Sequence, residues 1–240
     1  MNTTAELTIV IPAKNESRNL PRLLTSLSRQ DYPQLACTKV FVADAHSTDG
    51  TPAIARSFDH CLNIEVISGG LPSVGRNAGA KLATSRYVLF IDADIELHDP
   101  TLLRRAMATM TRRNLQCLTT NIWCSNGNLR DHMLYLGSDA VQYFASWTKP
   151  FATGMFMLFE KTKFDALGGF NEKALYAEDY LLSKQLSPRR FGIVRGSVST
   201  TNRRFQKMGH LKIVRMFLKT ALNTWNENYF LRDHEYWKEA

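Results

Sequence analysis

The sequence predicts an α/β fold, in which a mostly parallel central sheet carries helices on both of its faces. Short apolar segments typical of buried strands alternate with segments of helical periodicity, and the links between them are short. Such alternation is the pattern of a doubly wound sheet. Polar loops also follow the strands that end at Ile11, Ala43 and Ile91. Because the carboxyl ends of parallel strands meet at one edge, where ligands bind, these loops should lie together.

The first two strand–helix units have clear boundaries. Residues 7–11 are rich in β-branched side chains and predict a strand, and a second strand is expected over residues 39–43. Thr51 and Pro52 resemble an N-cap followed by a proline at the first helical position. Between the two strands, leucines recur at the spacing of one helical face and predict a helix packed on the sheet. These are Leu20, Leu23, Leu24 and Leu27.

The alternation continues through residue 91 and becomes less regular beyond it. A third strand is expected over residues 63–67, a helix over 73–83, and a wholly apolar fourth strand over 87–91. Gly154 lies inside an apolar segment and suggests close approach of a ligand. The further expected helices are residues 100–113, 130–143 and 177–186, and the further expected strands are residues 115–123, 151–159 and 191–200.

The fourth strand ends in Asp92-Ala93-Asp94, which places two carboxylates at the edge of the sheet. Carboxylate oxygens suit Mg²⁺ or Mn²⁺, ions that usually reach a protein site together with phosphate groups. The alternative is a polar turn in which Asp94 caps the segment that follows. Asp-x-Asp is a short motif, so these residues alone leave both interpretations open.

Length and composition bound the class of protein. A chain of 240 residues, 44% hydrophobic and 22% charged, is typical of one soluble domain with room for a small extension. The four cysteines lack the spacing of a metal site and are expected to be reduced and mostly buried. Neither a secretory signal nor a long apolar span is apparent. The expected location is therefore the cytoplasm.

Positive charge is concentrated in the C-terminal part of the chain. The net charge is +8, and residues 180–226 contain ten basic side chains and no acidic one. The remaining residues are close to neutral. A cationic block of this kind requires an anionic partner or a structural reason.

Six segments together resemble the family-2 glycosyltransferases, which have the Rossmann-like, nucleotide-sugar-binding GT-A fold. Each segment is a weak signal alone, but their order at the ends of the expected elements is specific. The resemblance covers roughly residues 7–205. The segments are residues 8–16 (TIVIPAKNE), 42–51 (VADAHSTDGT), 74–80 (VGRNAGA), 90–94 (FIDAD), 154–172 (GMFMLFEKTKFDALGGFNE) and 177–186 (AEDYLLSKQL). A Gly-rich phosphate loop after the first strand is absent, which argues against a dinucleotide oxidoreductase or a P-loop enzyme.

The resemblance implies a site for a nucleoside-diphosphate sugar and a divalent metal ion, Mn²⁺ or Mg²⁺. Asp94 would ligate the ion, and Asp92 would assist it or meet the ribose. Arg76 would approach the base or the diphosphate, since a guanidinium suits anionic oxygens. The full set of implied donor-binding residues is Pro12, Ala13, Asn15, Glu16, Asp44, Arg76, Asp92, Ala93, Arg203 and Arg204.

The resemblance also implies an inverting transfer, in which one carboxylate deprotonates the acceptor hydroxyl. It places this catalytic base at Asp179, with Glu178 beside it. Without the resemblance, two acids in the first turn of a helix are better explained as partners of the helix dipole. The Gln-x-x-Arg-Trp signature of the processive members is replaced here by Arg203-Arg204-Phe205. A non-processive enzyme acting on a glycan or lipid-linked acceptor is therefore expected.

Two departures from the family pattern leave the nucleotide base open. Ala45 follows Asp44 where the family often has a second aspartate, and Lys14 stands where an aromatic residue is common.

The expected organisation is a catalytic domain over residues 1–202, divided into a nucleotide-binding half (1–96) and an acceptor-side half (97–202). A helical extension is expected over residues 203–240.

A basic amphipathic helix is expected in this extension. Its apolar face would hold Leu211, Val214, Leu218, Leu222 and Trp225, and its basic face Lys212, Arg215 and Lys219. One interpretation is that the apolar face simply covers the domain. The other is that segment 203–225 lies on an anionic membrane surface, which would make the protein peripheral to the inner face of the membrane. His210, a further metal ligand in some relatives, is more often a surface residue.

Two functions of other classes compete with glycosyl transfer. The basic block over residues 180–226 would serve a nucleic-acid-binding protein, although it contains no recognisable binding module. An inactive, membrane-associated scaffold that still binds nucleotide sugars is the other alternative. The presence of all four candidate carboxylates argues against it. They are Asp92, Asp94, Glu178 and Asp179.

Overall fold

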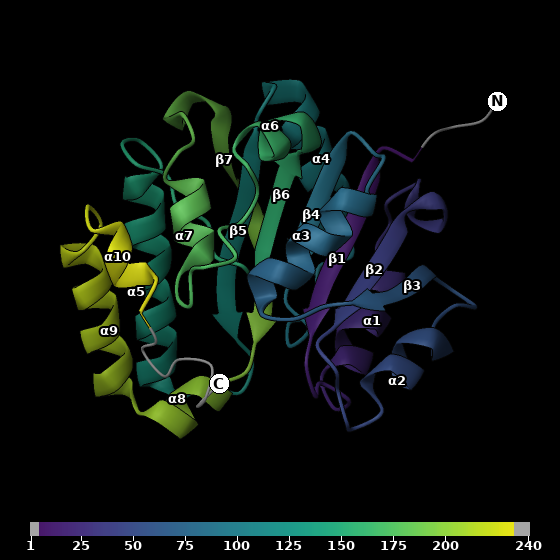
Figure 1. Cartoon of the computed structure of the whole chain (residues 1–240), viewed down its shortest axis with the longest axis horizontal. Coiled ribbons are helices and arrows are strands. Elements are labelled where there is room, and N and C mark those ends of the chain that lie inside the picture. The colour runs from purple at the N-terminus through teal and green to yellow at the C-terminus, as the bar shows by residue number, and fades with distance from the viewer. Residues whose placement is uncertain (1–4, 233–240) are drawn as a thin grey trace.

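The computed structural model describes residues 5–232 and contains a seven-stranded sheet in the order β3-β2-β1-β4-β6-β5-β7 (Figure 1). The strands are β1 (Leu7–Ala13), β2 (Lys39–Asp44), β3 (Asn63–Ser68), β4 (Tyr87–Ile91), β5 (Cys117–Cys124), β6 (Phe156–Glu160) and β7 (Phe191–Thr200). The helices are α1 (Leu20–Ser28), η1 (Leu35–Cys37), α2 (Thr51–Ser57), α3 (Pro72–Leu82), α4 (Leu102–Arg113), α5 (Leu129–Ala145), α6 (Lys161–Ala166), α7 (Glu178–Ser183), η2 (Pro188–Arg190), α8 (Arg203–Met208), α9 (His210–Leu222) and α10 (Glu227–Phe230). The predicted α/β class with a mostly parallel sheet is confirmed.

The first four strands form a parallel unit at one end of the sheet. β1 pairs in parallel with β2 on one side and with β4 on the other, and β2 pairs in parallel with β3. Every residue of β4 is buried, as its wholly apolar sequence predicts. The register sets Ala13 opposite Asp44, so the loops after β1 and β2 leave the same edge of the sheet. The expected meeting of these polar loops is therefore confirmed.

Helices α1 and α3 pack closely against the parallel strands. The four leucines that predicted α1 are all buried, at 0% exposure. Gly79 of α3 lies so close to β1 that an added Cβ would collide with the side chain of Val10. This contact draws α3 onto the sheet and fixes the position of Arg76, which is one helical turn earlier.

The second half of the sheet is mixed. β6 runs antiparallel to both β4 and β5, whereas β5 pairs in parallel with β7. The strand expected over residues 151–159 begins only at Phe156, so that prediction was wrong at its start. The reason is a different set of backbone partners: the N–H of Ala152 donates to Ser183 Oγ at 3.1 Å. Likewise the N–H of Gly154 donates to Asp179 Oδ2 at 2.8 Å. Residues 152–154 are therefore bonded to side chains of α7 and do not continue the strand.

Other boundaries also differ from those expected. The N-cap of α2 is Gly50, with φ of 85°, and Thr51 is its first helical residue. The Thr51 hydroxyl donates to Asp49 Oδ1 at 2.6 Å and accepts from the Glu16 N–H at 2.9 Å, so it holds two loops together. Of the cysteines, two are buried as expected, but Cys37 and Cys61 are exposed.

The C-terminal helices lie beside α5 at the end of the molecule farthest from α2 (Figure 1). Phe205 and Met208 of α8 and Ile213 of α9 form a small core with side chains of α5. The apolar face expected on this segment does not cover the domain: Leu211, Leu218, Leu222 and Trp225 are exposed. Among residues 5–232, we find no helix with the length and apolar character needed to cross a membrane. The boundary at residue 202 stays a prediction.

Candidate functional site

The loops after β1 and β2 are tied together at the edge of the sheet. Asn15 has a φ of 54°, in the left-handed region that asparagine tolerates better than most residues. Its N–H donates to Ser47 Oγ at 2.8 Å, and its Oδ1 accepts from the Thr48 N–H at 2.9 Å. Asp44 ends β2 and accepts from the Ser47 N–H at 3.1 Å. These reciprocal bonds bring the predicted residues Asn15 and Asp44 into one loop cluster.

Asp44 retains hydrogen-bonding capacity in this cluster. Its Oδ1 is buried and accepts no hydrogen bond within the described part of the chain. A buried carboxylate oxygen without a partner is costly unless a ligand or a water satisfies it. Asp44 therefore offers a hydrogen-bond acceptor at the edge of the sheet, opposite Ala13 at the end of β1.

Asp94 and Glu16 meet around one arginine. Asp94 follows β4, Glu16 follows β1, and Arg203 begins α8, so three distant segments converge here. Arg203 Nη2 donates to Glu16 Oε1 at 2.9 Å and to Asp94 Oδ2 at 3.2 Å. The sequence placed each residue in the site, but only the fold shows that Arg203 closes over the Asp94 carboxylate.

The electrostatics of Asp94 favour a cation beside it. Burial raises the pKa of the Asp94 carboxyl to about 6, the charge of Asp92 adds to this shift, and the Arg203 guanidinium opposes it. Arg204 also opposes it at longer range. A carboxyl whose charge is disfavoured by burial and by a second carboxylate is stabilised by any cation that comes close to it.

Arg76 forms a two-sided bridge at the centre of the site. It projects from α3, is only 2% exposed, and donates from Nη2 to Asp92 Oδ1 and from Nη1 to Glu178 Oε1, both at 2.6 Å. Burial alone would lower the pKa of Arg76, but Asp92 and Glu178 hold it above its ordinary value. The guanidinium also lies over the Phe170 ring, 5.2 Å from its centre. The bridge joins the end of β4 to the start of α7.

Gly154 is required by this bridge. An added Cβ would collide with the Arg76 guanidinium, so the group that closely approaches the glycine is a side chain of the protein. The expectation of close approach at this position is therefore correct, although the sequence alone pointed to a ligand.

Glu178 and Asp179 begin α7 but have different surroundings. The residue before them, Ala177, has a φ of 50°, a strained conformation for alanine of the kind that occurs at functional sites. Glu178 is buried and bonded to Arg76. Asp179 instead accepts backbone N–H groups, from Gly154 at 2.8 Å and from Tyr180 at 2.7 Å. Burial raises the pKa of Asp179 to about 6, and the Glu178 charge adds to the shift.

A cavity of about 150 Å³ opens directly beside these carboxylates. Its lining includes the predicted site residues Arg76, Asp92, Glu178, Asp179 and Arg204. Residues of α5 and α9 also line it. They include Leu134, Tyr135 and Ser138 of α5 and Ile213 and Phe217 of α9. The lining of the cavity therefore combines a candidate base with mostly apolar side chains from two helices.

Sequence reasoning missed Asn77, which follows Arg76 on α3. Its Nδ2 donates to the Phe170 carbonyl and to Glu172 Oε1, and its Oδ1 accepts from the Phe170 N–H, each at 2.9 Å. Asn77 thereby fixes the turn that carries the ring beneath Arg76. Its place inside the motif VGRNAGA was the signal that would have indicated it.

His210 has a structural role here. Its Nε2 lies 2.6 Å from Oδ1 of the buried Asp131, and its ring stacks on Phe205 with 5.1 Å between centres. Asp131 also accepts from Asn202 Nδ2 at 3.2 Å. The network joins α5 to α8 and α9, and sequence reasoning had not included Asp131.

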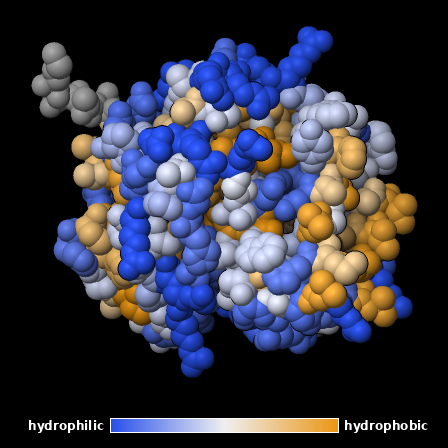
Figure 2. Space-filling view, turned by 180° about the vertical axis from the view of Figure 1, so that it is seen from behind, coloured by the Kyte–Doolittle hydropathy of each residue, from blue (hydrophilic) through white to orange (hydrophobic). Residues whose placement is uncertain are grey.

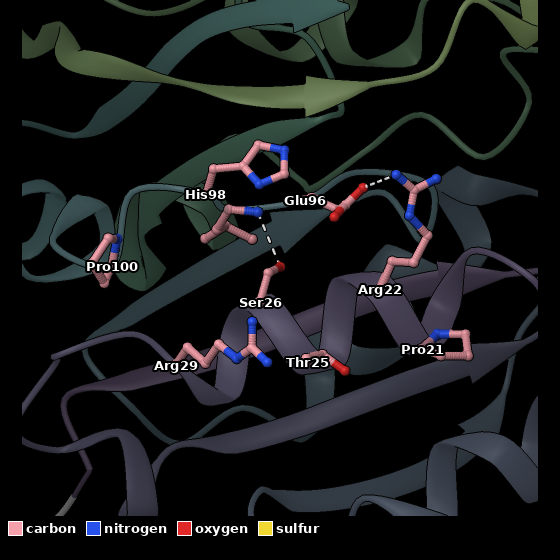
Figure 3. Close-up of a pocket in the computed structure, with 9 residues that line it drawn as sticks. Pro21, Arg22, Thr25, Ser26, Arg29, Glu96, His98 and Pro100 are labelled. Atoms are coloured by element: carbon pink, nitrogen blue, oxygen red, sulfur yellow. Dashed lines mark hydrogen bonds and ion pairs between the residues drawn. The ribbon is translucent and has the colours of Figure 1, made fainter. Parts of the chain in front are cut away.

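A second cavity, of about 430 Å³, lies between α1 and the segment that follows β4 (Figure 3). Arg22 and Ser26 project from α1 toward this segment, where Arg22 pairs with Glu96 and Ser26 Oγ accepts from the Leu97 N–H at 3.0 Å. Although larger, this cavity is lined by none of the predicted site residues. The cavity beside Asp179 is therefore the better candidate for the chemistry.

Comparison with known proteins identifies the family of the chain. The family model of glycosyl transferase family 2 matches residues 8–168, more than half of the chain, and the chain belongs to that family. The 4,4'-diaponeurosporenoate glycosyltransferase of Staphylococcus haemolyticus is 26% identical over 187 residues, which are 76% of this chain and 47% of that protein. The poly(ribitol-phosphate) beta-N-acetylglucosaminyltransferase TarS of Staphylococcus aureus is 33% identical over 101 residues, 40% of this chain and 18% of its own length. The chain thus spans about half or less of these curated relatives.

Solved structures show that the fold is GT-A. The mannosyltransferase PcManGT from Pyrobaculum calidifontis, solved with GDP-Man and Mn²⁺, gives a TM-score of 0.66 at 19% identity over 89% of this chain and 64% of that one. S. aureus TarS 1-349 with UDP-GlcNAc gives 0.62 at 21% identity over 80% of this chain and 58% of that one. The predicted family and fold are both confirmed.

Proposed function

We propose that the protein is a non-processive, inverting glycosyltransferase that moves one sugar from a nucleoside-diphosphate sugar to an acceptor hydroxyl. The observation that carries this proposal is the place of Asp179. It lies beside a cavity that it shares with Arg76 and Asp92, at the edge of the sheet where the polar loops of β1, β2 and β4 meet. Family membership supports the same reaction.

The residues at the end of β4 fit a divalent metal ion. Among the described residues, no group of three or more His, Cys, Asp or Glu side chains is arranged to hold a metal by itself. Mg²⁺ is commonly bound by one or two carboxylates together with substrate phosphates, and Asp94 and Asp92 supply that number. The raised pKa of Asp94 is the further sign of fit, because a cation would stabilise its charge. Mn²⁺ or Mg²⁺ held there would stabilise the negative charge of the leaving diphosphate.

The protein's own residues divide the remaining tasks. In this proposal Pro12, Ala13, Asn15 and Asp44 receive the nucleoside, with the unpartnered Asp44 Oδ1 as an acceptor for a base N–H. Arg203 and Arg204, on α8, face the carboxylate of Asp94 and would contact the diphosphate. Both Nη atoms of Arg76 are bonded to carboxylates, so we assign the residue to holding Asp92 and Glu178 in place.

Asp179 is the better candidate for the base because Glu178 is occupied. Glu178 is bonded to Arg76, whereas Asp179 accepts two backbone N–H groups and keeps lone pairs for an acceptor hydroxyl. A pKa of about 6 leaves Asp179 ionised at neutral pH and close to the range in which a general base is effective. The acceptor proton would pass to Asp179 as the hydroxyl oxygen attacks the sugar carbon opposite the leaving diphosphate.

A nucleotide-binding experiment tests the donor half of this proposal. We expect one nucleoside diphosphate, added with Mn²⁺ at a hundredfold excess over its Kd, to raise the melting temperature by at least about 5 °C. Asp94→Asn should remove the part of the shift that depends on the metal. Asp59→Asn, an exposed carboxylate far from the edge of the sheet, is the matched control. No shift with any common nucleoside diphosphate, with or without Mn²⁺, would refute the proposal.

The acceptor belongs to the same proposal. In this proposal a hydroxyl of a glycan or of a lipid-linked molecule enters the cavity, whose lining includes apolar side chains of α5 and α9. The basic segment 203–225 would contact an anionic membrane surface and hold the protein at its inner face. Screening nucleotide sugars for slow hydrolysis identifies the donor before an acceptor is known.

A further inference from the structure

Helix α5 has its apolar and polar faces reversed relative to an ordinary surface helix. Its buried side chains are Asp131 and Gln142, which are both polar. Its outward stripe is apolar and recurs every three or four residues along the helix and just past its end. Leu129, Met133, Leu136, Phe144 and Trp147 of this stripe are 64% to 75% exposed.

Helix α9, beside it, also has an exposed apolar stripe. It packs on the domain through Ile213, while Leu211, Leu218 and Leu222 project from the opposite side of the helix. Trp225 follows at 81% exposure, and its ring lies 3.5 Å from Nζ of Lys149, which follows α5. Figure 2 shows apolar side chains gathered on the edge of the molecule that carries α5 and α9. We refer to these exposed apolar residues of α5, α9, Trp147 and Trp225 as the outer apolar face.

An exposed apolar face of this size indicates that another molecule or a membrane covers it. The 17 residues of α5 extend over about 25 Å, at 1.5 Å per residue. Monomeric soluble proteins rarely leave so long an apolar stripe in water, and such surfaces mark interaction sites. Helix α5 cannot rotate to bury its apolar stripe, because Asp131 on its inner side is bonded to Asn202 and His210.

The charges around the outer apolar face identify what covers it. Exposed cations flank the stripes, namely Arg130 and Lys149 near α5 and Lys212, Arg215 and Lys219 on α9. The acids of these two helices are Asp131 and Asp139, and both are turned inward: Asp139 Oδ1 accepts from the Ile122 N–H at 3.2 Å. Apolar stripes bordered by cations and tryptophans, without an exposed carboxylate on either helix, suit the headgroup region of an anionic bilayer.

The two helices that carry the outer apolar face also line the cavity beside Asp179. Leu134, Tyr135 and Ser138 of α5 line that cavity from the inner side of the same helix. Phe217 of α9 lines it as well and is still 55% exposed, so it stands between the cavity and the outer surface. A chain seated on a bilayer through α5 and α9 would present Asp179 to hydroxyls carried by membrane lipids.

From these observations we infer that α5 and α9 together dock the protein on an anionic lipid bilayer, and that the acceptor is a hydroxyl of a lipid or lipid-linked molecule reached past Phe217. The assignment of the acceptor rests on the proposed glycosyl transfer, whereas bilayer docking is independent of it. The docking surface extends beyond segment 203–225, because its largest apolar stripe lies on α5.

Vesicle flotation tests the docking surface. The full chain should float at low salt with phosphatidylcholine vesicles that contain phosphatidylglycerol, and much less with phosphatidylcholine alone. Leu136→Asp and Leu218→Asp should each lower the bound fraction about tenfold, since each loses the burial of one leucine. Leu82→Asp on α3, where a leucine is also exposed, is the matched control and should float as the unchanged chain does. Asp179→Asn should also float normally.

Three results would overturn the docking inference. One is failure to float with anionic vesicles at low salt. Another is equal loss of flotation in the Leu82→Asp control. The third is a dimer, seen by sedimentation without lipid, that Leu136→Asp and Leu218→Asp dissociate, which would mean that a second copy covers the face.

Sugar transfer into washed membranes tests the acceptor. Labelled sugar from the donor should appear in the organic-solvent extract, and Leu136→Asp should reduce it while leaving hydrolysis of the donor in solution unchanged. Label in water-soluble glycan alone would overturn the acceptor class. If no donor is hydrolysed or transferred, the proposed function fails, and flotation still decides the docking surface.

Discussion

Helices α1 and α5 illustrate how differently the two halves of the molecule use similar apolar patterns. In α1 the four periodic leucines are all buried against the sheet. In α5 the periodic apolar residues face outward, and the buried positions belong to Asp131 and Gln142. Periodicity therefore reveals that a helix has an apolar stripe, but not which surface covers the stripe. The half that contains α1 buries the apolar stripe of this helix, and the half that contains α5 leaves its stripe exposed.

The largest expected effect is on the rate of sugar transfer, without an effect on nucleotide binding. Asp179→Asn removes the candidate base and should lower transfer about 10²- to 10⁴-fold. The melting-temperature shift given by the nucleotide should be unchanged, because the loops of β1, β2 and β4 are untouched. Steady-state transfer and thermal shift, measured on the same preparation, check both parts. Transfer at more than a tenth of the original rate would assign the base elsewhere.

The second largest expected effect is the loss of stability when the Arg76 bridge is removed. Arg76→Met leaves the buried Glu178 and the partly buried Asp92 without their partner, and should lower the free energy of unfolding by about 3–5 kcal/mol. Arg76→Lys keeps the charge but not the two-sided geometry, and should fall between Met and the unchanged chain. Denaturant unfolding measures both variants. A loss below about 1 kcal/mol for Arg76→Met would show that the bridge is not needed for stability.

A matched pair of substitutions tests the contrast between α1 and α5 directly. Leu24→Ala opens a cavity in the core and should cost about 2–5 kcal/mol in unfolding free energy. Leu136→Ala makes the same chemical change at an exposed position and should alter the unfolding free energy by no more than about 0.5 kcal/mol. Equal losses in the two variants, measured by denaturant unfolding without lipid, would mean that Leu136 is covered in solution.

The pH dependence of transfer should be the mildest effect. Burial raises the pKa of Asp179 to about 6, so below that pH the base becomes protonated and kcat/KM should fall about tenfold per pH unit. The same shift has the opposite sign for stability: the folded state holds this proton to higher pH than the unfolded state, so ionisation on raising the pH costs stability.

Asp139→Asn is the control for this titration. Burial also raises the pKa of Asp139 to about 6, yet its Oδ1 accepts from the Ile122 N–H and Asp139 is not among the residues that line the cavity. The acidic limb of the profile should therefore persist in this variant. A limb that disappears with Asp139, or whose midpoint lies below about 5, would contradict the assignment to Asp179.

The sequence predicted the parallel part of the sheet and its helices more completely than the mixed part. The parallel strands and the leucine face of α1 depend on local patterns, which short-range periodicity records well. The start of β6 was wrong because Ala152 and Gly154 bond to α7, a segment roughly thirty residues away. Asn77 and Asp131 were missed for the same reason, since their partners lie far along the chain.

The sequence by itself determined the α/β class, the family, and the carboxylates and arginines available for the site. These follow from the order of residue types along the chain, which determines strand ends and helix starts. Only the tertiary structure decided that Arg76 bonds Asp92 and Glu178, that Arg203 closes on Asp94, and that the apolar stripe of α5 faces outward. Each of these depends on which distant segments become neighbours, and the burial of polar groups such as Asp131 fixes that choice only when the whole chain is folded.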